Sequence, residues 1–186
     1  MLAKRHFQET HANLLARLLP PHNVLIDLDV SSKKRVFEHA GLLFENFHNI
    51  ARSQVFDSLF AREKLCSTGL GQGIAIPHGR IKGLREAVAA VIRTREPIPF
   101  DAPDGRPVKL VVVLLEPERA SNLHLRILAE LAQMFSDTTF LDKLMRADTP
   151  ETMHRLIADW APIERLTTDD SRNAQSLTPP SPGRRG

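Results

Sequence analysis

The residues from Val108 to Leu115 form a nearly continuous apolar run, and this run constrains the fold more than any other feature of the chain. Only Lys109 interrupts it, and four of the other residues are valines, which favour β-strands. A strand that is apolar on both faces must be buried on both faces, so it needs a layer of structure above and below it. Helical patterns before and after it can supply those layers. The sequence therefore predicts an α/β layered sandwich, a small mixed β-sheet flanked by helices on both faces.

The remaining elements follow from apolar spacing, caps and turn residues. Four strands are expected, at about residues 23–28, 74–76, 87–92 and 108–115. Pro97, Pro99 and Pro103 predict that the third strand ends early. One helix is expected behind the caps Ser31 and Ser32, and a second helix follows it and reaches residues 62–64. Further helices are expected over about residues 119–135, 138–146 and 150–159, the last capped by Asp148 or Thr149.

Three segments divide the chain. Residues 1–22 read as an N-terminal extension whose apolar spacing fits either a helix packed on the domain edge or a frayed leader, and both interpretations stay open. Residues 23–163 form the predicted domain. Residues 164–186 are rich in Pro, Ser and polar side chains, so we expect a disordered C-terminal tail.

Composition excludes several classes of protein. The 25 Lys and Arg are scattered among 22 Asp and Glu, which argues against a nucleic-acid-binding face. The single cysteine, Cys66, excludes a disulfide framework and an all-cysteine metal site. The sequence offers neither a long apolar segment for membrane insertion nor a secretory signal, so we expect a cytoplasmic protein.

A glycine-rich segment, residues 67–73, precedes the strand at 74–76. Its order is helix, glycines, strand, whereas a dinucleotide site has strand, glycines, helix. No nucleotide cofactor is therefore expected. The segment fits either a tightly turned loop or a loop whose backbone approaches an anion.

Two histidines lie where the predicted sheet could bring them together. His78 follows the strand at 74–76, between Pro77 and Gly79, and His124 lies in the opening turns of the helix after the most apolar strand. A neutral imidazole is a competent nucleophile toward phosphorus, and the transferred group needs nearby donors for its oxygen charges. The hydroxyls of Ser67 and Thr68 and the Arg62 guanidinium are the candidates nearest to His78 in the sequence.

The same residue types also occur in two other kinds of site, a hydrolase site and a metal site. A hydrolase with Ser67 or Thr68 as nucleophile and His78 as base lacks a G-x-S-x-G elbow and an acid to orient the histidine. A metal site built on His78 and His124 lacks further ligands at suitable spacing, so no metal is expected.

Three segments carry a resemblance to a known family. The stretch 62–79, REKLCSTGLGQGIAIPHG, resembles the signature of the IIA domain of the fructose/mannitol class of the phosphoenolpyruvate-dependent phosphotransferase system. Residues 97–105 and 124–132 are similar to the same family. The resemblance implies the IIA fructose/mannitol-type fold, a phosphoryl group accepted on His78, support from His124 as the second histidine, and Arg62 near the site. Cys66, just before Ser67, is a small departure from the pattern.

The resemblance also implies partners. The donor would be an HPr-like phosphocarrier, and no independent turnover of a small molecule is expected. Residues 30–35, VSSKKR, resemble the nitrogen-related branch, whose recipients would be regulatory proteins such as a sensor kinase or potassium transport components. The alternative is a sugar-specific IIA component that passes phosphate to a separate IIB.

Overall fold

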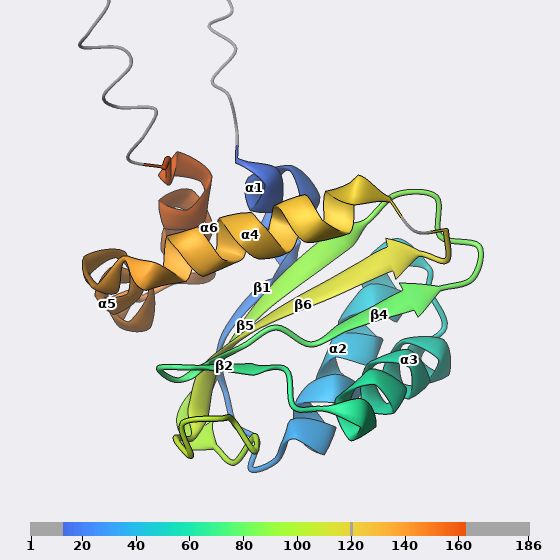
Figure 1. Ribbon diagram of the computed structural model, residues 1–186, viewed down its shortest axis with the longest axis horizontal. Helices are drawn as coiled ribbons and strands as arrows, with labels where there is room; N and C mark the ends of the chain where they lie inside the picture. The colour runs from blue at the N-terminus through green and yellow to red at the C-terminus, as the bar shows by residue number, and fades with distance from the viewer. Residues whose placement is uncertain (1–12, 120, 163–186) are drawn as a thin grey trace, which may run out of the picture.

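A six-stranded mixed sheet forms the centre of the molecule (Figure 1). The computed structural model describes residues 13–119 and 121–162. The strands are β1 (Val24–Leu28), β2 (Gly69–Gly71), β3 (Ile74–Ala75), β4 (His78–Ile81), β5 (Val88–Ile98) and β6 (Val108–Pro117). Their order is β1-β5-β6-β3-β2, and β4 also pairs with β6, beyond β3 along the same edge. The pairs β5–β6 and β2–β3 are antiparallel, and the others are parallel.

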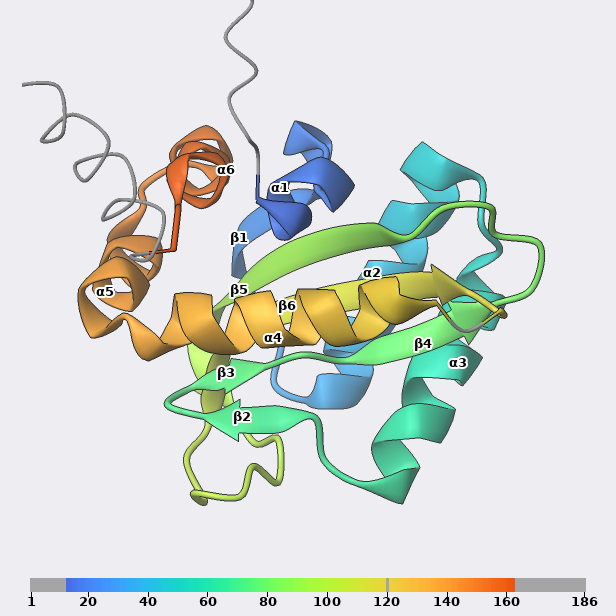
Figure 2. The ribbon, with the colours of Figure 1, turned by 45° about the horizontal axis from the view of Figure 1, so that its top comes forward.

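Helices cover both faces of this sheet, as predicted (Figures 1 and 2). The helices are α1 (Leu14–Leu18), the 3-10 turn η1 (Pro21–Asn23), α2 (Lys33–His48), α3 (Arg52–Leu65), α4 (Asn122–Ser136), α5 (Thr138–Arg146) and α6 (Pro150–Asp159). The pair α2 and α3 packs on one face, and α1, α4, α5 and α6 pack on the other. None of the helices within residues 13–119 and 121–162 is long and apolar enough to span a membrane.

Strand β6 divides the core into two clusters, which confirms that it is buried on both faces. Leu110, Val112 and Leu114 pack in the cluster under α4. Val111 and Val113, which point to the opposite face, pack under α2 and α3. All five side chains are at most 1% exposed, so both faces of this strand are covered.

Helix caps agree with the sequence, and one strand end does not. The Ser32 side chain accepts a hydrogen bond from the Arg35 amide, and Thr149 is the residue that caps α6. Strand β5, predicted to end near Ile92, continues through Pro97 to Ile98. Its register against β6 shifts between Arg93 and Ile98, and such an irregularity lets a proline stay in the strand without disrupting the ladder.

Residues 13–22, assigned above to the extension, pack against the rest of the fold. Leu15 and Leu19 are buried in the α4-side core. The Asn13 amide donates to the carbonyls of Ile157 and Trp160, at 2.7 and 3.0 Å. The Glu130 carboxylate on α4 accepts the first two amides of α1 at 3.0 Å. Residues 1–12 of the predicted extension and the predicted tail, residues 164–186, lie outside the described part of the chain.

Candidate functional site

His78 follows the strand at 74–76, as expected, but it is itself the first residue of a further strand, β4. Strand β3 ends at Ala75, and the Ile76 amide donates to the Thr68 carbonyl at 3.0 Å, next to the antiparallel pair of Gly69 and Ala75. The chain rejoins β6 after Pro77, whose carbonyl accepts the Leu114 amide at 3.0 Å. His78 then pairs with Leu114, which directs its side chain to the α4 side of the sheet.

One ring nitrogen of His78 is fixed by the backbone. Nδ1 lies 2.8 Å from the Ile76 carbonyl oxygen, and because a carbonyl only accepts, Nδ1 carries the proton and donates. Nε2 of the neutral ring therefore keeps its lone pair. Burial lowers the pKa of His78, and the positive charges of Arg62 and His124 lower it further, against the opposing effects of the Ile76 hydrogen bond and Glu116. The lowered pKa therefore favours the neutral ring.

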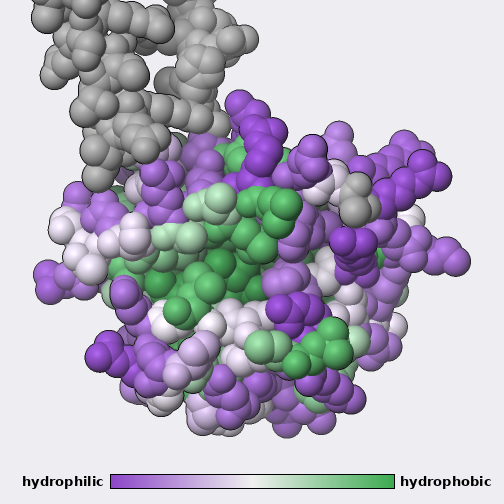
Figure 3. Space-filling view, viewed as in Figure 1, coloured by the Kyte–Doolittle hydropathy of each residue, from purple (hydrophilic) through white to green (hydrophobic). Residues whose placement is uncertain are grey.

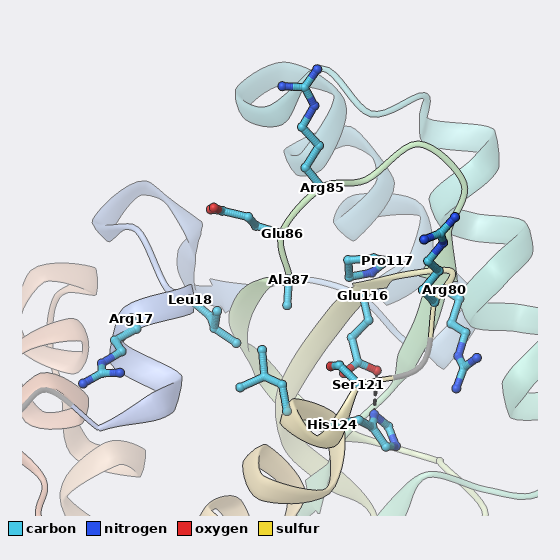
Figure 4. A pocket seen from close by; sticks show the side chains of 12 residues that line it. Arg17, Leu18, Arg80, Arg85, Glu86, Ala87, Glu116, Pro117, Ser121 and His124 are labelled. Atoms are coloured by element: carbon cyan, nitrogen blue, oxygen red, sulfur yellow. Dashed lines mark hydrogen bonds and ion pairs between the residues drawn. The ribbon is translucent and has the colours of Figure 1, made fainter.

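His124 lies across from His78, on the first turn of α4. The two ring centroids are 5.3 Å apart, with 58° between the ring planes. Nδ1 of His124 is bonded to the carboxylate of Glu116, a buried residue near the end of β6 (Figure 4). An ionised carboxylate only accepts, so Nδ1 is the donor in this bond. Nε2 of His124 takes no part in it. The structure thus brings together the two histidines that the sequence singled out.

Arg62 reaches the same place from the last turn of α3. It lines a cavity of about 380 Å³ together with His78, Arg80, Glu116 and His124, which we call the histidine pocket. One of its guanidinium nitrogens donates to the Cys66 carbonyl at 2.9 Å, which leaves other donors available.

A close contact between α3 and β4 allows this approach. A Cβ added to Gly79 would lie 2.2 Å from the Ser58 hydroxyl oxygen and 3.0 Å from Ser58 Cβ. Only glycine at position 79 therefore lets α3 sit this near to the strand that carries His78.

Thr68 lies beside His78, but its hydroxyl proton is already used. Thr68 Oγ1 donates to the Glu63 carboxylate at 2.6 Å, and the Thr68 amide donates to the same carboxylate at 3.2 Å. Glu63 is itself buried and bonded to Lys33 at 3.2 Å. Thr68 does line a smaller cavity of about 210 Å³ next to His78 and Arg62, so it is near the site while its hydrogen bonds hold the loop.

The glycine-rich segment is a tight hairpin turn. Gly69–Gly71 forms β2, which pairs with β3, and the turn between them has positive φ at Gly71 and Gly73. The Gln72 amide in this turn donates to the Asp104 carboxylate at 2.9 Å. The structure thus shows a tightly turned loop, and the approach of its backbone to an anion stays a prediction.

The other chemistries find little support in this geometry. The Ser67 hydroxyl donates to the Phe100 carbonyl at 2.7 Å, so its proton is directed at the backbone and not at an imidazole. Within the described ranges, no three side chains of His, Cys, Asp or Glu are grouped as metal ligands.

Sequence reasoning missed Glu116 and Arg80. Glu116 follows six buried apolar residues of β6 and precedes His124 by eight positions. A single carboxylate at the end of so apolar a strand was the available signal, because burying it requires a hydrogen-bond partner.

Comparison with known proteins identifies the family of this chain. The family model described as "Phosphoenolpyruvate-dependent sugar phosphotransferase system, EIIA 2" matches residues 17–160. The chain belongs to this family. The predicted resemblance to IIA domains is thereby confirmed.

The members of the IIA family that resemble this chain at higher identity are nitrogen regulatory proteins. A nitrogen regulatory protein of Pseudomonas aeruginosa is 40% identical over 146 residues, which are 78% of this chain and 95% of that protein. The nitrogen regulatory protein of Escherichia coli is 36% identical over 129 residues, 69% of this chain and 79% of that protein. The crystal structure of nitrogen regulatory protein IIA-Ntr from Neisseria meningitidis is 49% identical, with a TM-score of 0.74, and covers 78% of this chain and 99% of that one.

The mannitol IIA of Escherichia coli shares the fold at lower identity. Its crystal structure is 20% identical with a TM-score of 0.64, over 75% of this chain and 98% of that chain. The predicted IIA fructose/mannitol-type fold is therefore confirmed as well, and the preference for the nitrogen-regulatory branch agrees with the relatives of higher identity.

Proposed function

We propose that His78 is the phosphoryl acceptor of this IIA protein and that the group is attached to Nε2. The chain is a phosphocarrier of the phosphotransferase system with a nitrogen-regulatory role, in keeping with its family and relatives. The observation that carries the assignment of the nitrogen is the bond from Nδ1 of His78 to the Ile76 carbonyl, which leaves Nε2 as the free nucleophile.

The transfer step balances without any cofactor. The Nε2 lone pair attacks phosphorus, the P–N bond of a donor phosphohistidine breaks, and its electron pair returns to the donor imidazole. The His78 ring keeps its Nδ1 proton and gains positive charge as the new bond forms. The Ile76 carbonyl oxygen, already in place, stabilises that charge, since a hydrogen bond strengthens when its donor becomes charged.

Two groups are placed to stabilise the phosphoryl oxygens. Arg62 lines the histidine pocket and supplies fixed positive charge and several N–H donors. His124 can donate from Nε2 when it is protonated, and the Glu116 carboxylate at Nδ1 would counter the charge of that imidazolium. Thr68 is assigned a positioning role, because its hydroxyl proton goes to Glu63.

An apolar margin around the histidines suits a docking protein. Leu65, Leu70 and Leu125 are large apolar side chains that are 82%, 51% and 69% exposed. Leu65 lines the histidine pocket, Leu70 lines the smaller cavity beside it, and Leu125 follows His124 on α4. Figure 3 shows an apolar area across the middle of this face, where α4 lies. Ile74, which follows the glycine-rich segment, is buried and packs in the core, so it is not part of this surface.

The donor that we propose for this surface is an HPr-like phosphocarrier. The recipients that we favour are regulatory proteins, a sensor kinase or potassium transport components, because the relatives of higher identity are nitrogen regulatory proteins. A separate IIB domain is the second candidate recipient. It is supported by a solved complex of mannitol IIA with phosphorylated IIB from Escherichia coli, which resembles this chain in fold at 20% identity.

Phosphoryl transfer from phosphoenolpyruvate through purified general components tests the acceptor. We expect acid-labile, base-stable label on the wild-type protein and none on His78→Gln. His39→Gln, on α2 across the sheet, is the matched control and should take up label normally. Label on His78→Gln at the wild-type level would overturn the proposal.

A further inference from the structure

A second cavity, about 460 Å³ in volume, adjoins the histidine pocket (Figure 4). The two cavities share Arg80, Glu116 and His124, whereas His78 lines only the histidine pocket. Its walls come from α1, from residues 85–87 before β5, from the end of β6 and from the start of α4. Because four arginines line it, we call it the arginine cavity; they are Arg17, Arg80, Arg85 and Arg119.

The middle of the arginine cavity is apolar, and its margin is positively charged. The apolar lining consists of Leu18, Ala87, Pro117 and Leu123. Figure 4 shows Leu18 and Ala87 at the centre, with Arg17 and Arg85 turned outward at the margin. Two carboxylates oppose the four guanidinium groups, and one of them, Glu116, is already bonded to His124.

The margin arginines have no partner within the described part of the chain. Arg17, Arg85 and Arg119 form no ion pair with any described side chain, whereas Arg35 and Arg95 elsewhere on the surface each pair with a carboxylate. Positive charges around one cavity raise its electrostatic potential, which favours the binding of an anion. Guanidinium groups also match phosphate and carboxylate oxygens with two parallel hydrogen bonds.

We propose that the arginine cavity binds a small organic anion with an apolar body and at least two negative charges, of which a nucleoside diphosphate is the type. The apolar body lies over Leu18 and Ala87, and the anionic groups meet the arginines at the margin, away from Glu116. The cavity volume lies within the range of about 300–1,000 Å³ that is usual for small-molecule sites.

The shared wall couples this ligand to phosphoryl transfer, a part of the inference that rests on the proposed function. Arg80 lines both cavities and is held by one hydrogen bond of 3.2 Å to the Glu118 carbonyl. An anion in the arginine cavity draws Arg80 away from the histidine pocket. It also adds negative charge beside the place where the phosphoryl group arrives. The ligand therefore slows phosphoryl uptake by His78.

Calorimetric titration of the full chain tests the binding, with ADP, adenosine and inorganic pyrophosphate as probes. We expect ADP to bind saturably at one site with a Kd below about 1 mM, and the other two, which lack either the charge or the apolar body, to bind at least about tenfold more weakly. The variant R85Q/R119Q should weaken ADP binding at least about tenfold. R35Q and R95Q are matched controls that remove exposed arginines elsewhere and should change it less than twofold.

A cavity-filling variant shows whether ADP binds inside the cavity or is only attracted by the charge of the surface arginines. Ala87→Leu leaves every charge in place and should abolish ADP binding. Three results would overturn the site: no saturable binding of ADP, equal binding of ADP and pyrophosphate, or equal weakening by the control arginine variants.

The coupling is measured separately, by uptake of label from a purified phosphorylated donor. Saturating ADP should slow uptake by wild type several-fold and leave uptake by R85Q/R119Q unchanged. Equal rates with and without bound ADP would overturn the coupling. Absence of label on wild type without ADP would instead refute the proposed function, and the calorimetric result would still decide the binding site.

Discussion

The two histidines of the site are held at Nδ1 by partners of different charge. His78 donates to a neutral backbone carbonyl within its own segment, where burial lowers its pKa. His124 donates to the carboxylate of Glu116, which comes from a different element of the fold. A carbonyl that accepts from Nδ1 fixes the tautomer of a neutral ring. A carboxylate at Nδ1 can in addition balance the positive charge of a protonated ring. The difference supports the proposal that His78 is the nucleophile and that His124 stabilises charge.

The largest expected effect separates these two roles. His78→Gln should take up no label at any time, because the attacking nitrogen is gone. His124→Gln should reach the wild-type end point but about 10²-fold more slowly, as when one donor to a developing anion is removed. Time courses of label uptake measure both. Slow but complete labelling of His78→Gln, or normal rates for His124→Gln, would reverse the assignment.

A smaller effect is expected when only the charge behind His124 is removed. Glu116→Gln keeps an oxygen that can accept from Nδ1 but cannot balance an imidazolium. We expect transfer about tenfold slower, as for other residues that support a ligand or base from behind. Glu118→Gln, an exposed residue on the same segment, is the control and should transfer normally. Equal rates for the two variants would show that the carboxylate does no more than orient the ring.

The spacing between Arg62 on α3 and His78 on β4 depends on the close contact between these two elements. Gly79→Ala should destabilise the fold by about 1–3 kcal/mol, because the new Cβ would overlap the Ser58 hydroxyl. Urea unfolding measures the loss. Ser58→Ala in the same background removes the nearest atom and should recover part of it. A fully stable Gly79→Ala protein would mean that the spacing of Arg62 and His78 is not set by this contact.

The smallest effect concerns pH. Because the folded-state pKa of His78 lies below its ordinary value of about 6.5, the unfolded chain binds this proton first as pH falls. His78 thus lowers stability as pH drops through about 6.5, and the loss levels off below its folded pKa. Wild type should lose more stability than His78→Gln between pH 7 and 5, by urea unfolding at each pH. His48, whose pKa is also lowered, is present in both proteins and cancels.

The layers of the fold could be predicted because the apolar spacing of the sequence shows which faces must be buried. The apolar run of β6 has to be covered on both faces, and Ser32 and Thr149 mark where helices begin. Details that depend on pairing could not be predicted. Pro97 was expected to end β5, and only the register shift against β6 explains why it does not.

The site was predictable in its residues and not in its hydrogen bonds. His78, His124 and Arg62 lie in recognisable sequence contexts, and the structure brings them around one pocket. That Glu116 stands behind His124, and that Glu63 takes the Thr68 hydroxyl, depends on strand register and loop path, which no local pattern encodes. The choice between the two imidazole nitrogens of His78 came only from the Ile76 carbonyl.

The position of the phosphoryl group on the His78 ring tests the proposed function most directly. Long-range proton–nitrogen NMR spectra of the ¹⁵N-labelled phosphoprotein, compared with the unphosphorylated protein and with His124→Gln, identify the substituted nitrogen. We expect phosphorus on Nε2 of His78, with the Nδ1 proton retained and bonded to the Ile76 carbonyl. Phosphorus on Nδ1 of His78, or on His124, would contradict it.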